Sequence, residues 1–131
     1  MKIHAVGGYN EVGKNMTAVQ LNSEDVLLCD AGLYLPPIVE LEERENNQSI
    51  YNEKTLRKLG AIPDDTYLDR MHLRDKVRAL LVSHAHLDHV GALPYLAQRY
   101  GADIVGTQFT MEVLKTLERD QNIHQQYSVR L

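Results

Sequence analysis

The sequence predicts an α/β fold in which helices cover one face of a single β-sheet. Short runs of mainly aliphatic and β-branched residues, bounded by glycine or polar turns, indicate strands at 2–6, 16–21, 26–29, 77–82 and 103–106. Apolar residues recur at helical spacing at 90–100 and 110–119, and each predicted helix follows a strand. This order predicts one sheet with both helices packed on the same face. Residues 127–131 indicate the start of a further strand.

The beginning of the chain predicts two tight connections. A glycine-containing loop, Gly7–Asn15, joins the first two strands, and a polar turn at Asn22–Asp25 reverses the chain into the third. Two β runs around such a turn indicate an antiparallel hairpin. The third strand ends at Asp30-Ala31-Gly32, where the glycine lets the backbone turn sharply.

The stretch from about residue 37 to residue 74 differs from the rest of the chain in composition and in periodicity. It is rich in glutamate at 40–45, and its helical periodicity at 51–59 is weak. Asp64-Asp65-Thr66 is typical of a cap for a short helix that continues through Arg74. We interpret 37–74 as a polar, partly helical insertion, too polar to bury a core. We therefore expect an exposed loop that contacts other proteins or flanks the substrate path.

Composition limits the functional classes. The 131 residues fit one small domain, and 44% hydrophobic with 24% charged residues is ordinary for a globular protein. A net charge of −4 argues against a chain coated in positive charge for non-specific nucleic-acid binding, although RNA as a substrate stays open. The single cysteine, Cys29, forms no internal disulfide and is expected in the core. Without a signal peptide or a long apolar span, we expect a cytoplasmic location and no membrane contact.

The segment Ser83–His89 carries the chemistry. It contains His84, His86, Asp88 and His89, four potential metal ligands within six positions directly after a predicted strand. Residues two apart on an extended backbone project to the same side, so His84 and His86 can bind one ion together. Where the chain turns into a helix, Asp88 and His89 are redirected and can reach a second ion. Imidazole and carboxylate suit Zn²⁺, so we predict a two-zinc site.

The six histidines of the chain fall into two groups. Surface histidines at a strand end are common, but three of the six histidines of the chain fall in this one segment, which favours a metal site. His4, His72 and His124 stand alone and are assigned no role. Lys14 follows a glycine, but the spacing of a phosphate-binding P-loop fails at Asn15.

These motifs resemble a known family. His84-x-His86-x-Asp88-His89 resembles the signature of the metallo-β-lactamase superfamily, and 26–32 resembles its upstream aspartate motif. The opening segment 7–16 (Gly-Gly-Tyr-Asn-Glu-Val-Gly-Lys-Asn-Met) and the segment 89–96 resemble the ribonuclease J branch, its archaeal-type members most closely. The resemblance covers most of residues 2–120, except the stretch around 37–74.

The resemblance implies both architecture and roles. The chain would be the N-terminal half of an αββα sandwich, whose open sheet face is apolar. His84 and His86 would hold one zinc ion, and Asp88 and His89 the other. Asp30 would steady the metal loop by hydrogen bonding, whereas the alternative is an aspartate that only forms the turn. The implied activity is zinc-dependent hydrolysis of RNA phosphodiesters in RNA decay and processing, 5′-to-3′ exonucleolytic with endonuclease cleavage besides.

The resemblance also places parts of the site outside this chain. The further metal ligands of the family and its nucleic-acid-clamping domain lie downstream, so two ligands per ion fall short of the usual three. We expect the isolated chain to be inactive and to need its missing C-terminal portion or another copy. Two alternatives stay open, a small-molecule hydrolase acting on a thioester or lactam, and a non-catalytic fragment that serves as an assembly module.

Overall fold

The computed structural model describes residues 1–45, 51–124 and 127–131, and these residues form one six-stranded mixed sheet. The strands lie side by side in chain order. They are β1 (Lys2–Gly7), β2 (Met16–Gln20), β3 (Val26–Cys29), β4 (Val77–Leu81), β5 (Asp103–Val105) and β6 (Val129–Arg130). Strands β1, β2 and β3 pair antiparallel, whereas β3 to β6 pair parallel. The five predicted strands and the predicted hairpin are confirmed, and β6 lies in the predicted final segment.

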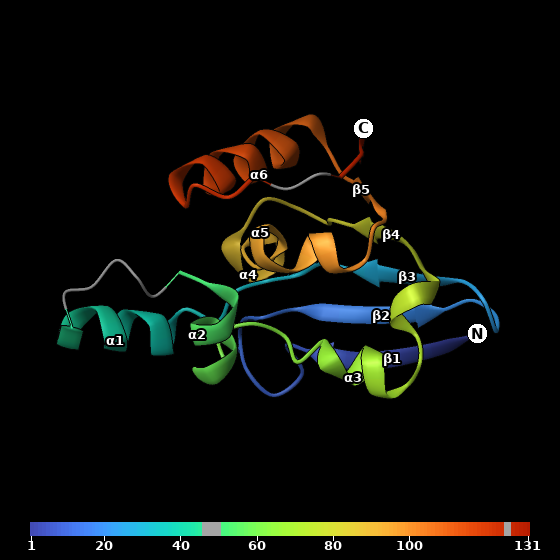
Figure 1. Ribbon diagram of the computed structural model, residues 1–131, viewed down its shortest axis with the longest axis horizontal. Helices are drawn as coiled ribbons and strands as arrows, with labels where there is room; N and C mark the ends of the chain where they lie inside the picture. The colour runs from blue at the N-terminus through green and yellow to red at the C-terminus, as the bar shows by residue number, and fades with distance from the viewer. Residues whose placement is uncertain (46–50, 125–126) are drawn as a thin grey trace.

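Short helices cover one face of this sheet. They are α1 (Pro36–Glu45), α2 (Glu53–Lys58), α3 (Thr66–Arg70), the 3₁₀ turn η2 (Arg74–Lys76), α4 (Leu87–Val90), α5 (Leu93–Leu96), the 3₁₀ turn η3 (Ala97–Arg99) and α6 (Gln108–Asp120). Figure 1 shows α2, α3, α4 and α5 in front of the strands, with α6 beyond them near β5. Within the described ranges, every helix is too short or too polar to cross a bilayer.

Alternation along the strands separates a buried face from an open one. The register places one residue of each strand from β1 to β5 in a row beneath the helices, and these five side chains are buried: His4, Ala18, Leu28, Leu80 and Ile104. The neighbouring row on the other face is accessible and largely apolar: Ile3, Val19, Leu27 and Ala79. An accessible apolar sheet face is the feature predicted for half of a sandwich.

The expectation of an exposed insertion at 37–74 is wrong. Ile38, Leu56, Leu68 and Leu73 are each no more than 4% exposed and belong to the same core cluster as the strands. Each short helix contributes only one or two apolar side chains, so the segment shows little periodicity. These side chains pack on the sheet, and the segment therefore needs no core of its own.

The predicted cap at Asp65 is also corrected. Helix α3 begins after Asp65, but that side chain makes no capping hydrogen bond, and the helix ends at Arg70 rather than Arg74. The Asp65 carboxylate is instead fully buried and paired with Arg57 at 2.6 Å and Arg99 at 3.1 Å. The charges of these two guanidinium groups offset the cost of burying the carboxylate.

The helix predicted at 90–100 is broken, whereas that at 110–119 is longer than predicted. The first begins at Leu87 and divides into α4, α5 and η3. Pro94, in the first turn of α5, has no amide hydrogen and cannot continue the hydrogen bonding of α4. Helix α6 starts at Gln108 because the Thr110 amide donates to Thr107 Oγ1 at 3.2 Å.

Candidate metal centre

The predicted ligands gather at the carboxyl end of β4. The segment 83–89, here the metal loop, leaves the strand and enters α4 at Leu87. The His84 ring lies 4.6 Å from that of His86 and 4.1 Å from that of His89, between centroids. Asp88 Oδ2 is 3.4 Å from His89 Nε2. Side chains that are neighbours in the motif are thus neighbours in space as well.

The contacts among the four side chains run in a row, from His86 through His84 and His89 to Asp88, rather than forming a closed cage. Across the described ranges, no three His, Cys, Asp or Glu side chains converge closely enough to hold an ion together. The contacts join His84 to its neighbouring imidazoles and Asp88 to His89. This arrangement differs from a closed structural zinc site and suits a chain that contributes part of a ligand set. The ligand roles stay a prediction.

Asp30 contacts the metal loop through both carboxylate oxygens. Its Oδ1 accepts a hydrogen bond from the Ser83 amide at 2.7 Å, and its Oδ2 accepts one from Ser83 Oγ at 2.8 Å. Oδ2 also lies 2.8 Å from His89 Nδ1. An ionised carboxylate only accepts, so in the neutral imidazole Nδ1 carries the proton and Nε2 carries the lone pair, which Asn15 Nδ2 approaches to 3.3 Å. The turn at Asp30 has a φ of 63°, which aspartate tolerates better than most residues.

Ser83 orients a second imidazole and was missed as a functional residue. Its hydroxyl donates a hydrogen bond to Asp30 Oδ2, so the hydroxyl oxygen accepts from His84 Nδ1, which lies 2.9 Å away. His84 Nε2 is therefore also left with a free lone pair, the form in which imidazole binds metals. The only sequence signal for Ser83 is its position directly before the motif.

The backbone of the metal loop is held by the turn that follows β3. The Ala31 amide donates to the His89 carbonyl at 2.8 Å. A Cβ on Gly32 would lie 1.6 Å from the Asp88 carbonyl oxygen, so only glycine allows this approach. Two segments far apart in sequence are thereby locked together at the predicted ligands.

Comparison with known proteins places this site in a family. The family model described as the metallo-beta-lactamase superfamily matches residues 9–128. The chain belongs to the metallo-beta-lactamase superfamily. Membership of this superfamily supports metal binding, while the residues that bind and the identity and number of the ions are proposals.

Within the superfamily, the chain is similar to ribonucleases J. It is 41% identical over 115 residues to Ribonuclease J of Methanocaldococcus jannaschii, covering 88% of this chain and 25% of that protein. It is 45% identical over 117 residues to Ribonuclease J of Pyrococcus abyssi, covering 88% and 24%. Ribonuclease J 2 of Streptococcus pyogenes is 33% identical over 125 residues, covering 93% and 19%. The chain spans about a quarter or less of the length of these relatives, and the predicted resemblance is confirmed.

A hollow of about 430 Å³ lies beside the metal loop of this metallo-beta-lactamase domain. Asp30 and Ser83 line one side, and the ends of β3, β4 and β5 supply Cys29, Leu81 and Val105. Cys29 is only half-buried here, and burial raises the pKa of its thiol. The hollow opens on the apolar sheet face, so the predicted ligands lie where that face ends.

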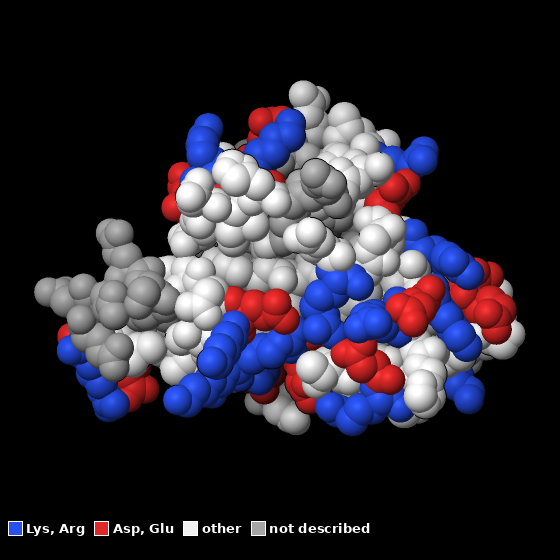
Figure 2. Space-filling model, in the orientation of Figure 1, with Lys and Arg blue, Asp and Glu red and all other residues white. Residues whose placement is uncertain are grey.

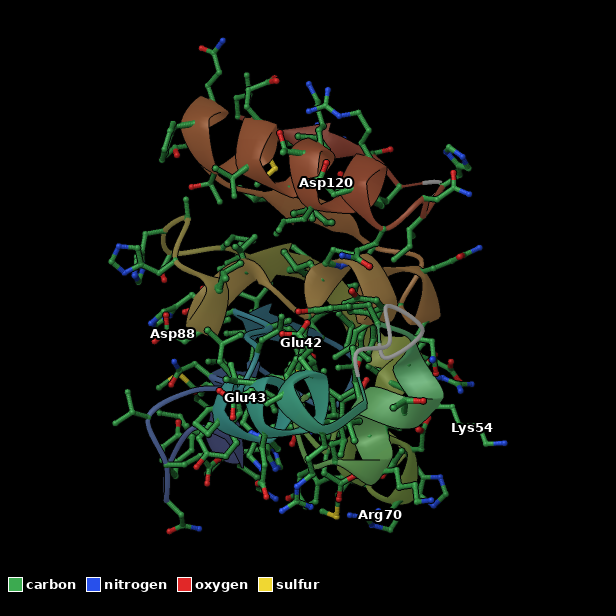
Figure 3. The ribbon with its side chains drawn as sticks, turned by 90° about the vertical axis from the view of Figure 1, so that its left-hand side faces the viewer. Glu42, Glu43, Lys54, Arg70, Asp88 and Asp120 are labelled. Atoms are coloured by element: carbon green, nitrogen blue, oxygen red, sulfur yellow. The ribbon has the colours of Figure 1, made fainter. Side chains whose placement is uncertain are left out.

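Charge of both signs covers the helical face on the other side of the molecule. Figure 2 shows basic and acidic side chains interleaved there. Arg70 pairs with Asp64 at 3.2 Å and Arg78 with Asp25 at 2.8 Å, so much of the positive charge is neutralised locally. Figure 3 shows Asp88 on the side opposite Arg70. The helical face is thus not a uniformly basic surface for a polyanion.

Proposed function

We propose that this chain is the N-terminal portion of a metal-dependent ribonuclease that hydrolyses RNA phosphodiesters. The observation that carries the proposal is the metal loop, locked by Asp30 within a chain 41–45% identical to two archaeal ribonucleases J. These relatives are named for cleavage of RNA, so RNA is the proposed substrate here.

His84 and His86 would hold one zinc ion, and Asp88 and His89 a second, with further ligands supplied from outside residues 1–131. Zinc, when bound, supplies a water of lowered pKa and neutralises charge on a phosphodiester. The residues of this chain prepare the site. Asp30 holds His89 with Nε2 free, because its carboxylate accepts from Nδ1.

The finer details of the activity belong to the same proposal. We propose 5′-to-3′ exonucleolytic cleavage, with endonucleolytic cleavage besides, in RNA decay and processing. A cytoplasmic location and completion of the site by the C-terminal portion or a second copy also stay proposals. A thioester or lactam hydrolase and a non-catalytic assembly module gain no support, since the relatives quoted above are all ribonucleases.

The test is RNA cleavage by the full-length protein and by Asp88→Ala and His86→Ala. Both variants should lose cleavage and keep the wild-type circular dichroism spectrum, because each removes a proposed ligand. His124→Ala, an exposed histidine outside the metal loop, is the matched control and should cleave normally. A chromogenic lactam and a thioester should not be hydrolysed.

Undiminished RNA cleavage by Asp88→Ala would contradict the proposal. Metal analysis of residues 1–131 alone tests the half-site. We expect zinc to bind weakly or not at all, because only two ligands per ion are present. Two tightly held zinc ions in a monomer of these residues would refute it.

A further inference from the structure

Asn15, the last residue of the loop between β1 and β2, reaches the metal loop from 73 positions away in the sequence. Its Nδ2 lies 2.9 Å from the Asp88 carbonyl oxygen. The same nitrogen lies 3.3 Å from Asp88 Oδ2 and 3.3 Å from His89 Nε2. One amide group therefore contacts both predicted ligands of one ion.

The donor count of this amide indicates what it does. The side-chain NH₂ of Asn15 has two hydrogens, and the shortest contact assigns one of them to the Asp88 carbonyl. The other faces Asp88 Oδ2 and His89 Nε2, which are 3.4 Å apart. Both of these atoms accept hydrogen bonds, since His89 Nδ1 donates to Asp30. Two facing acceptors repel each other unless a positively polarised group lies next to both, and the second amide hydrogen is such a group.

The backbone around Asn15 is held independently of its side chain. The Asn15 amide donates to the Asp88 carbonyl at 3.1 Å, and the Asn15 carbonyl accepts from the Gly32 amide at 3.1 Å. Gly8 makes room for the side chain, because a Cβ there would lie 2.2 Å from Asn15 Oδ1. Removing the side-chain donor therefore leaves the connection between the two loops in place.

We propose that Asn15 is a positioning residue, which holds Asp88 and His89 in a ligand arrangement before a metal ion binds. This inference rests on the proposed metal-dependent function. Asp88 Oδ2 and His89 Nε2 would hold a bound ion in place of the second amide hydrogen. The hydrogen bond to the Asp88 carbonyl stays, so the start of α4 keeps its place.

The test compares Asn15→Leu, which keeps the size of the side chain but has no donor, with Asn22→Ala in the full-length protein. Asn22 is an exposed turn residue that also donates to a carboxylate, Asp25, and lies outside the site. Zinc affinity is measured by competition with a chromophoric chelator, and ligand geometry by the visible spectrum of the Co²⁺ form. Asn15→Leu should bind zinc on the order of 10- to 100-fold more weakly and shift the Co²⁺ bands. Asn22→Ala should match the wild type in both.

The possible results distinguish a failure of the proposed role of Asn15 from a failure of the proposed metal-dependent function. A wild-type protein that binds no zinc refutes the proposed function. A wild type that binds zinc, together with Asn15→Leu of equal or higher affinity and an unchanged Co²⁺ spectrum, overturns the role of Asn15 alone. Thermal melting of the metal-free forms checks folding. If Asn15→Leu does not melt cooperatively, Asn15→Ala carries the test with the same expected loss of zinc affinity.

Discussion

Replacing Asp65 with asparagine should lower the free energy of unfolding by about 3 kcal/mol, because it removes the charge at the centre of a buried ion cluster. The Asp65 side chain has no exposed surface and lies 2.6 Å from Arg57 and 3.1 Å from Arg99. The Tyr100 hydroxyl donates a further hydrogen bond to Asp65. Burial lowers the pKa of both arginines, but their acidic partners together outweigh it and raise the pKa. Asp65 is the largest of these partners, joined by Glu53 at Arg57 and by Asp69 at Arg99.

The other partners of the two arginines place the expected loss of stability at the lower end of the range for broken buried ion pairs. Removing one partner of a buried ion pair costs roughly 3–5 kcal/mol. Arg57 keeps Glu53 at 3.0 Å and Arg99 keeps Asp69 at 2.6 Å, so neither arginine is left without a carboxylate. The contact between Arg57 and Asp65 Oδ1 is short, yet Oδ1 accepts no well-aligned hydrogen bond within the described part of the chain. The contact between Arg57 and Asp65 therefore stabilises the fold as an ion pair, without an added contribution from a hydrogen bond.

Chemical unfolding of the protein and of Asp65→Asn measures the difference, with Asp64→Asn as the matched control. The Asp64 side chain is 65% exposed and pairs with Arg70, which is 61% exposed, so this change should stay within about 0.5 kcal/mol. Equal shifts for the two variants would refute the reasoning. They would also show that α2, α3 and η3 are not joined through a buried charge.

Three further outcomes are expected. Gly32→Ala should lower the free energy of unfolding, measured by thermal melting, by at least about 3 kcal/mol, because its Cβ would overlap the Asp88 carbonyl. A variant as stable as the wild type would contradict the close approach of these two segments. Asp30→Asn should weaken zinc binding roughly 10- to 100-fold in a chelator competition, since asparagine tolerates the turn but supplies no carboxylate. An unchanged zinc affinity would indicate that Asp30 only forms the turn. Burial raises the pKa of Tyr51 and Tyr95 to about 12, and it raises the pKa of Tyr100 and Tyr127 as well. These phenols ionise more readily once unfolded, so Tm should fall as the pH rises from about 10 to 12, and a flat profile would count against their burial.

The chain from 37 to 74 shows where sequence reasoning failed. Periodicity detects an element that buries a whole stripe of side chains, as α6 does. Leu56 and Leu68 are each the one buried residue of a helix of at most six residues, and such an element leaves no repeat to detect. The role of Asp65 in a buried ion cluster could not be predicted for a related reason, because its partners Arg99 and Tyr100 come from a segment distant in the sequence.

Local pattern was enough to predict the strands, the hairpin and α6, and it is also the basis on which His84, His86, Asp88 and His89 are predicted as ligands. Strand alternation, helical spacing and a motif within six positions are properties of neighbours in the chain. Only the tertiary structure decided which groups orient those ligands. Asp30 and Asn15 reach His89 across 59 and 74 positions, through hydrogen bonds that depend on how the turn after β3 and the first loop pack on the metal loop. The sequence determined the types of the predicted ligands, and long-range packing determined their positions and their hydrogen-bond partners.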